Sequence, residues 1–132
     1  MSATFMDMQD DHNGSNGSLI ADAPGLGALL DSFKGREPFS FLLVGDGGFT
    51  LTVGWRPDVM SVQFGPSGGT PPYHMARFGE ESEGEGTVEF LSSGTPTPIR
   101  RHFCLPTDTA RKVILDFLAN GRQSGAVGWE EI

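Results

Sequence analysis

The sequence predicts an α+β fold: a single domain with one curved antiparallel sheet of about six strands and two main helices on one face. Two observations carry this prediction. Short segments of strand-like residues, separated by Gly- and Pro-rich turns, follow one another between residues 39 and 105. Two segments with helical spacing flank this region. A length of 132 residues with 37% hydrophobic residues suits one domain with a modest core.

The first 18 residues are predicted to be a disordered tail, followed by one domain over residues 19–132. The run from His12 to Ser18 contains only polar residues and glycine, so little of it can be buried. The N-terminus also lacks the basic and apolar regions of a secretory signal peptide. A single cysteine cannot form an intramolecular disulfide. These features favour a cytoplasmic protein.

A short helix is predicted over residues 24–34. The apolar residues at helical spacing are Leu26, Leu29, Leu30 and Phe33. Pro24 stands near the start and Gly35 follows the end, as is common at helix boundaries.

Six strands are predicted after this helix. They cover residues 39–44, 49–55, 59–64, 73–78, 87–91 and 99–105. The second strand alternates most clearly, with Phe49, Leu51, Val53 and Trp55 on one side and threonines on the other. The turn at residues 45–48 joins the first two strands as a hairpin. Residues 65–72, 79–86 and 92–98 are predicted loops.

The clearest element is a helix over residues 106–120, followed by a closing strand over residues 125–130. The apolar stripe of this helix consists of Ala110, Val113, Ile114, Phe117 and Leu118. Pro106 suits the first turn, and Thr107 or Asp108 can cap the helix or balance its N-terminal dipole. Gly121 stands where a helix-terminating glycine belongs.

The acidic composition favours a basic protein partner. The net charge is −8, which disfavours nucleic acid as a direct ligand and favours steered encounter with a basic surface. Five carboxylates and no cation lie between Gly79 and Phe90. This stretch is read as a solvated loop, as a partner contact or, less readily, as a catalytic carboxylate pair. The candidate partner-binding residues are Glu80, Glu81, Glu83, Glu85, Asp46, Asp58 and Trp55. Trp55 and Trp129 are more typical of packing than of interface anchors.

Motifs for catalysis and cofactor binding are weak. The sequence has no phosphate-binding Gly-Lys-Ser/Thr loop and no Gly-x-Ser-x-Gly turn. His102 and Cys104 are two residues apart, but without a second cysteine they favour a structural strand over a metal or thiol site. We therefore expect no catalytic residue, no cofactor and no metal, and no membrane segment, since no apolar run approaches 20 residues.

The C-terminal third resembles the Imm-one family of immunity proteins from bacterial polymorphic toxin systems. The matching residues are Leu105-Pro106-Thr107, Ala110, Phe117-Leu118-Ala119-Asn120-Gly121 and Val127-Gly128-Trp129. Gly121 and Trp129 are eight residues apart, which is similar to the family spacing. The likeness extends over residues 24–131, and residues 105–129 carry its specific part. Arg122 and Ser124 depart from the family pattern, which often has glycine and proline there.

The resemblance implies an α+β antitoxin without enzymatic activity, whose partner is a cognate toxin domain. Toxins of these systems are frequently nucleic-acid deaminases, which bind substrate in a basic groove that an acidic protein can cover. The expected function is therefore occlusion of the active site or substrate groove of a toxin, with a cytosine deaminase favoured. Two alternatives remain: a non-neutralising adaptor or secretion chaperone for an effector, and a small enzyme using His74 or His102 with a carboxylate.

Overall fold

A computed structural model of the protein describes residues 2–8, 10, 12–32, 39–56, 58–78, 86–92 and 95–132. The elements in chain order are β1 (Ala3–Asp7), β2 (Leu19–Ile20), α1 (Ala23–Asp31), β3 (Phe39–Gly45), β4 (Phe49–Trp55), β5 (Val59–Pro66), β6 (His74–Arg77), β7 (Thr87–Ser92), β8 (Thr95–Arg100), a turn of 3-10 helix (Arg101–Phe103), β9 (Leu105–Pro106), α2 (Thr107–Asn120) and β10 (Gly128–Glu131).

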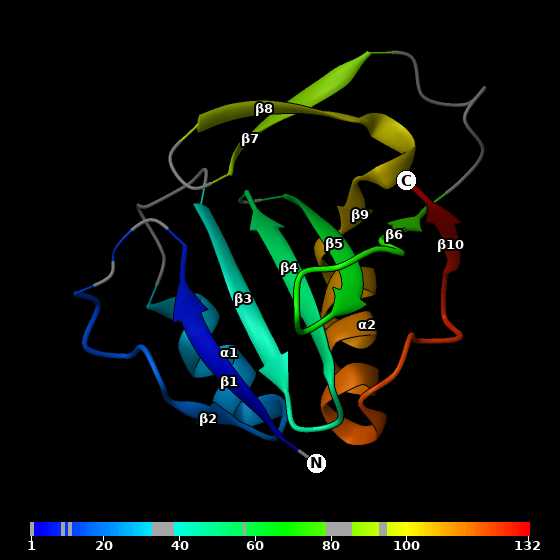
Figure 1. Ribbon diagram of the computed structural model, residues 1–132. Helices are drawn as coiled ribbons and strands as arrows, with labels where there is room; N and C mark the ends of the chain where they lie inside the picture. Colours follow the sequence, from blue (N-terminus) through cyan, green and yellow to red (C-terminus); the bar gives the residue numbers. More distant parts are fainter. Residues whose placement is uncertain are drawn as a thin grey trace.

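One antiparallel sheet forms the body of the molecule, with α1 and α2 packed behind it (Figure 1). Its strand order is β10-β6-β5-β4-β3-β1-β2, and β9 pairs with β5. A separate hairpin of β7 and β8 crosses the top of the sheet in Figure 1. The predicted α+β class, the curved antiparallel sheet and the two helices on one face are confirmed.

The alternation of side chains decides which sheet face the helices cover. Phe41 of β3 pairs with Val53 of β4, which pairs with Val62 of β5, and all three side chains are fully buried. The apolar stripe of α2 packs on this face, because all five of its predicted members are buried. The strands therefore have one apolar face toward the helices and a second face that points away from them.

Both predicted helices are confirmed within the described residues. Asp22 caps α1 by accepting a hydrogen bond from the Gly25 N–H at 2.8 Å. Gly121 ends α2 in the left-handed conformation with φ of 69°. The N-cap of α2 is Pro106, and no side chain makes a capping hydrogen bond there. Asp108 lies in the first turn, where its charge balances the helix dipole as predicted. None of the described helices is long and apolar enough to cross a membrane.

The predicted disordered tail over residues 1–18 is wrong for the described part of that stretch. Residues 3–7 form β1, which pairs along its whole length with β3. Phe5 is fully buried, and its ring packs in a tilted arrangement against that of Phe41, with centroids 5.6 Å apart. The polar run that follows folds back on Asp7, which is 5% exposed. Burial of one aromatic residue and a closed set of hydrogen bonds order a segment whose composition predicts disorder.

Asp7 organises the turn between β1 and β2. Its carboxylate accepts hydrogen bonds from the Asp10 backbone N–H at 3.0 Å and from the Asn13 side chain at 2.9 Å. Its own backbone N–H donates to Asn16 Oδ1 at 2.7 Å. The Asn and Gly residues therefore form a defined turn in which side chains replace backbone partners.

The predicted loop at 92–98 and the predicted strand at 99–105 are also wrong. Residues 95–100 form β8, which pairs with β7. Pro96 and Pro98 are compatible with this strand because β7 is its one partner among the described strands. Backbone positions that point away from β7 need no N–H for strand pairing. After β8 the chain turns through the 3-10 segment, and only Leu105 and Pro106 pair again, with β5.

Candidate binding surface

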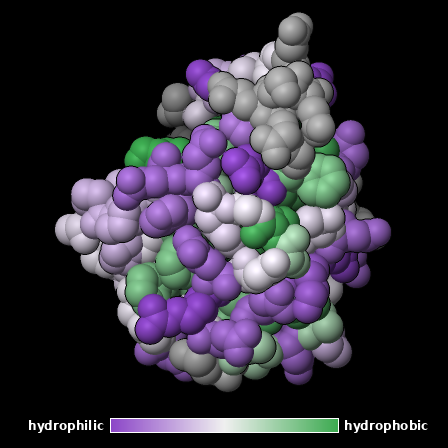
Figure 2. Space-filling model, turned by 90° about the vertical axis from the view of Figure 1, so that its right-hand side faces the viewer, coloured by the Kyte–Doolittle hydropathy of each residue, from purple (hydrophilic) through white to green (hydrophobic). Residues whose placement is uncertain are grey.

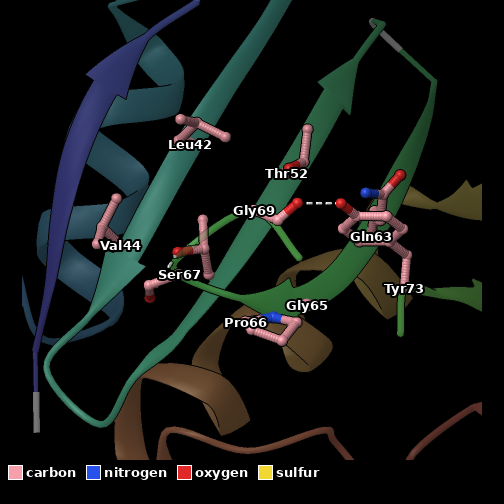
Figure 3. A pocket seen from close by; sticks show the side chains of 10 residues that line it. Leu42, Val44, Thr52, Gln63, Gly65, Pro66, Ser67, Gly69 and Tyr73 are labelled. Carbon is pink, nitrogen blue, oxygen red and sulfur yellow. Dashed lines mark hydrogen bonds between the residues drawn. The ribbon is translucent and has the colours of Figure 1, made fainter. Parts of the chain in front are cut away.

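The sheet face that points away from the helices carries an open groove over β3, β4 and β5 (Figure 3). The groove has a volume of about 320 Å³. Leu42 and Val44 line one side, and Gln63 and Tyr73 line the other. Thr50 and Thr52 of β4 form the floor between them. Successive side chains of a strand point to opposite faces of the sheet. The pattern that buries Leu51 and Val53 against the helices therefore places the neighbouring threonines on the open face.

Local hydrogen bonds shape the groove wall formed by residues 66–73. Thr50 Oγ1 and Ser67 Oγ are 2.9 Å apart, which ties the β5–β6 connection to β4. The Tyr73 hydroxyl donates to the Gly69 carbonyl across that connection (Figure 3). The wall is therefore held in place over a floor of paired strands, which makes the groove a preformed feature.

The β7–β8 hairpin closes the upper end of this face. Phe90 is 3% exposed and packs where β4 has no side chain, at Gly54. Arg56 Nη1 donates to the Glu89 carbonyl at 2.6 Å, which adds a second attachment. Beneath the hairpin a smaller cavity of about 140 Å³ continues from the groove, and Thr52 and Gln63 line both.

An apolar strip extends the groove toward the sheet edge at β2. Register places Leu19, Thr4 and Val44 in one row across β2, β1 and β3. A second row runs from Met6 to Leu42 and Thr52. Leu19 is 71% exposed and Met6 is 37% exposed. We call Met6, Leu19, Leu42 and Val44 the open-face strip.

Charge is distributed unequally along the chain. Residues 1–55 contain seven carboxylates and only two Lys or Arg residues, both outside the described residues. The described cations begin at Arg56 and lie on later elements, such as Arg77 on β6 and Arg100 on β8. On β1 to β4 themselves the one charged residue is the buried Asp7. Exposed carboxylates close to these strands in the chain include Asp46 in the turn before β4, and Asp22 and Asp31 at α1. Figure 2 views the molecule from the side of β6 and β10, where hydrophilic residues predominate around small apolar patches.

The predicted partner-binding residues have different placements. Glu80, Glu81, Glu83 and Glu85 lie outside the described residues. Asp46 and Asp58 are exposed in the turns before and after β4, whose seven residues separate them by roughly 24 Å. Trp55 is 7% exposed and packs in the core. The side chain therefore has a packing role and is not a surface anchor.

His102 is a buried histidine that lies beside the partly exposed Glu130. The His102 side chain is 1% exposed, and its Nε2 lies 3.7 Å from Glu130 Oε2. Neither ring nitrogen makes a hydrogen bond. The predicted strand position of His102 is wrong, because the residue lies in the 3-10 turn that follows β8. A histidine this enclosed has no access to a substrate, although it has a carboxylate neighbour.

Cys104 is a buried structural thiol. Its Sγ contacts the Arg100 carbonyl at 3.5 Å. Burial raises the pKa of the thiol, and the nearby charge of Arg101 lowers it by a smaller amount. The protonated form is a poor nucleophile and a poor metal ligand. Within the described ranges, no three His, Cys, Asp or Glu side chains gather closely enough to hold a metal ion.

No protein-family model matches the chain, and no curated protein matches it. The resemblance to the Imm-one family therefore stays a prediction from the residues that carry it.

The open groove itself was not predicted as a site. Its lining is made of threonine, serine, glutamine, tyrosine and aliphatic residues, which carry no catalytic or metal signature in a sequence. The available signal was the exposed side of the alternating strand 49–55, where Thr50 and Thr52 stand opposite the core residues.

Proposed function

We propose that this protein is an immunity protein that binds a cognate bacterial toxin domain and occludes its active site or substrate groove. The observation that supports this proposal is the uncharged groove with its apolar strip, in a chain whose net charge is −8. Protein interfaces combine an apolar, weakly charged centre with a polar rim. Carboxylates at the rim would attract a basic surface and speed association.

The resemblance of residues 105–129 to the Imm-one family supplies the class of partner. Within that class we favour a nucleic-acid deaminase that acts on cytosine, because its substrate groove must attract phosphates and is therefore basic. A protein that covers such a groove needs no catalytic residue, cofactor or metal of its own. Its place of action would be the cytoplasm of the cell that makes the toxin.

The direct test is survival of cells that express the toxin domain. The C-terminal domain of the neighbouring large gene is expressed with or without this protein, and colonies are counted. A toxin carrying an alanine at its catalytic glutamate serves as the control for general toxicity. We expect this protein to restore colony numbers by several orders of magnitude. Cells that die with or without it would contradict the proposal for that pair.

The same cells identify the toxin class. We expect C-to-T changes to accumulate in the genomes of partly rescued cells if the toxin is a DNA cytosine deaminase. Rescue without such changes would retain the immunity function and reject that deaminase class. Binding of an active toxin without loss of its activity would favour the adaptor alternative instead.

A further inference from the structure

We propose that the open groove and the open-face strip are the docking surface for a basic protein domain, which inserts a large uncharged side chain between Leu42 and Tyr73. This inference rests on the proposed function, because it takes the partner to be the toxin domain. It adds the face of the molecule that the partner covers, the chemistry of the inserted group and the direction in which the partner's cations point.

The first step is the exposure of apolar groups on this face. Met6 and Leu19 are two of the four large hydrophobic residues with substantial exposure in the described chain. Both lie on the same sheet face as Leu42 and Val44, in adjacent rows of the register. The five neighbouring strands β2, β1, β3, β4 and β5 give this face a width of roughly 20 Å. This width is large enough for contact with another protein. Contiguous exposed apolar groups of this kind mark interaction sites.

The lining of the groove determines which kind of side chain can enter it. The groove is lined by uncharged residues only. A charged group buried there would lose its hydration without gaining an opposite charge. Thr52 brings a hydroxyl group and Gln63 an amide group into the groove, and Tyr73 offers an aromatic wall. Tyrosine or tryptophan fits this setting best, because each combines a large apolar body with one polar atom.

The third step is charge complementarity. Asp46 stands in the turn at one end of the groove, and Glu89 is exposed on the hairpin at the other end. The strands β1, β3 and β4 contain no Lys or Arg. Arg77 and Arg100 lie instead toward β6 and β8. A basic partner would therefore direct its cations toward Asp46 and Glu89 at the two ends of the groove, and away from the Arg77 and Arg100 side chains.

The test compares two substitutions that change the net charge equally. Val44→Lys places a cation on the groove wall, and Ala28→Lys places one on the exposed surface of α1, behind the sheet. The probe is the purified toxin domain with its catalytic glutamate replaced by alanine. Affinity is measured by calorimetry in about 0.5 M salt, where long-range attraction is screened.

We expect V44K to weaken binding at least tenfold and A28K to change it by less than twofold. Thermal unfolding of both variants shows whether each is folded. If V44K does not fold, Thr52→Arg on the groove floor replaces it with the same expectation. Folded groove variants that bind as tightly as the wild type would overturn the proposal, as would an equal loss in A28K.

A footprint on the unmodified protein gives an independent result. Hydroxyl-radical labelling of Met6, Leu19 and Tyr73 should fall several-fold when the toxin domain is bound. Leu115 on α2 should be labelled equally in the free and bound protein. Protection of Leu115 without protection of Met6 and Tyr73 would place the interface on the helix side and overturn the inference. Absence of any binding by the wild type would instead contradict the proposed function.

Discussion

Phe90 of the β7–β8 hairpin packs against Gly54 of β4 so closely that a Cβ on residue 54 would lie 2.9 Å from Cδ1 of the phenylalanine ring. The same Cβ would lie 2.5 Å from Ser61 Oγ. The absence of a side chain at position 54 therefore lets the hairpin rest on the sheet. This contact sets the upper limit of the open groove.

Gly54→Ala is expected to lower the free energy of unfolding by about 2 kcal/mol, because the added methyl group overpacks this contact. Urea unfolding measures the change. Gly27→Ala is the matched control, since nothing lies within 4 Å of a Cβ at that helical position. Gly27→Ala should raise the free energy of unfolding by roughly 0.5–1 kcal/mol, because alanine loses less conformational freedom than glycine in a helix. Equal stability of G54A and the wild type would show that the hairpin does not depend on close approach.

His102→Phe is expected to stabilise the protein by about 1 kcal/mol. The substitution removes two ring nitrogens that make no hydrogen bond, and such unsatisfied buried groups cost about 1–3 kcal/mol each. It keeps a ring against Phe103, whose centroid is 4.1 Å from that of His102. Thermal unfolding provides the measurement. A loss of stability in H102F would indicate that the imidazole has a partner, and Glu130→Gln would then produce a similar loss.

The strands and helices with strong periodicity were predictable from the sequence. Residues 49–55 alternate between apolar and polar side chains, and Ala110 to Leu118 form an apolar helical stripe. Each pattern shows within one segment which face is buried, so it can be recognised without knowing the rest of the fold. β1 was not predictable in this way, since its five residues precede a polar run and are ordered by pairing with β3 and β2, which follow later in the chain. The prolines at 96 and 98 concealed β8 for a similar reason, because they are tolerated only in a ribbon whose partner is β7.

The candidate site was less predictable than the fold. Asp46 and Asp58 were foreseen as exposed turn residues, and both are exposed. Alternation places Trp55 with Phe49 on the core face, which favours packing, but the sequence does not show how completely a strand end is covered. Trp55 therefore stayed among the candidate contacts, and the structure buries it. The groove joins residues from β3, β5 and the segment before β6, so only the tertiary register brings Leu42 near Gln63.

Asp7→Ala is expected to destabilise the protein by about 2 kcal/mol. The carboxylate is buried, and its removal leaves the Asp10 N–H and the Asn13 amide without their acceptor. Asp10→Ala is the matched control, because that exposed carboxylate accepts from the His12 N–H alone and should matter by about 0.5 kcal/mol. Urea unfolding separates the two. Similar small losses in both variants would contradict an ordered N-terminal turn.

Asp116→Asn is expected to cost about 1 kcal/mol at neutral pH and progressively less in acid. Hydrogen bonds from Lys112 and Ser124 lower the pKa of the Asp116 carboxyl. A lowered folded-state pKa means that the carboxylate stabilises the fold above its unfolded value of about 3.9. This stabilisation is lost as the pH falls through the folded-state pKa. Unfolding at pH 7 and at about pH 3 measures the difference, and a difference that grows in acid would contradict the assigned cause.

Stoichiometric inhibition of the purified toxin domain would show whether this protein neutralises a toxin by binding it. Deamination of a cytosine-containing single strand is followed while this protein is added. We expect activity to fall linearly to zero at one molar equivalent, and association to slow as salt screens the acidic rim. Full activity in the presence of excess folded protein would contradict the account.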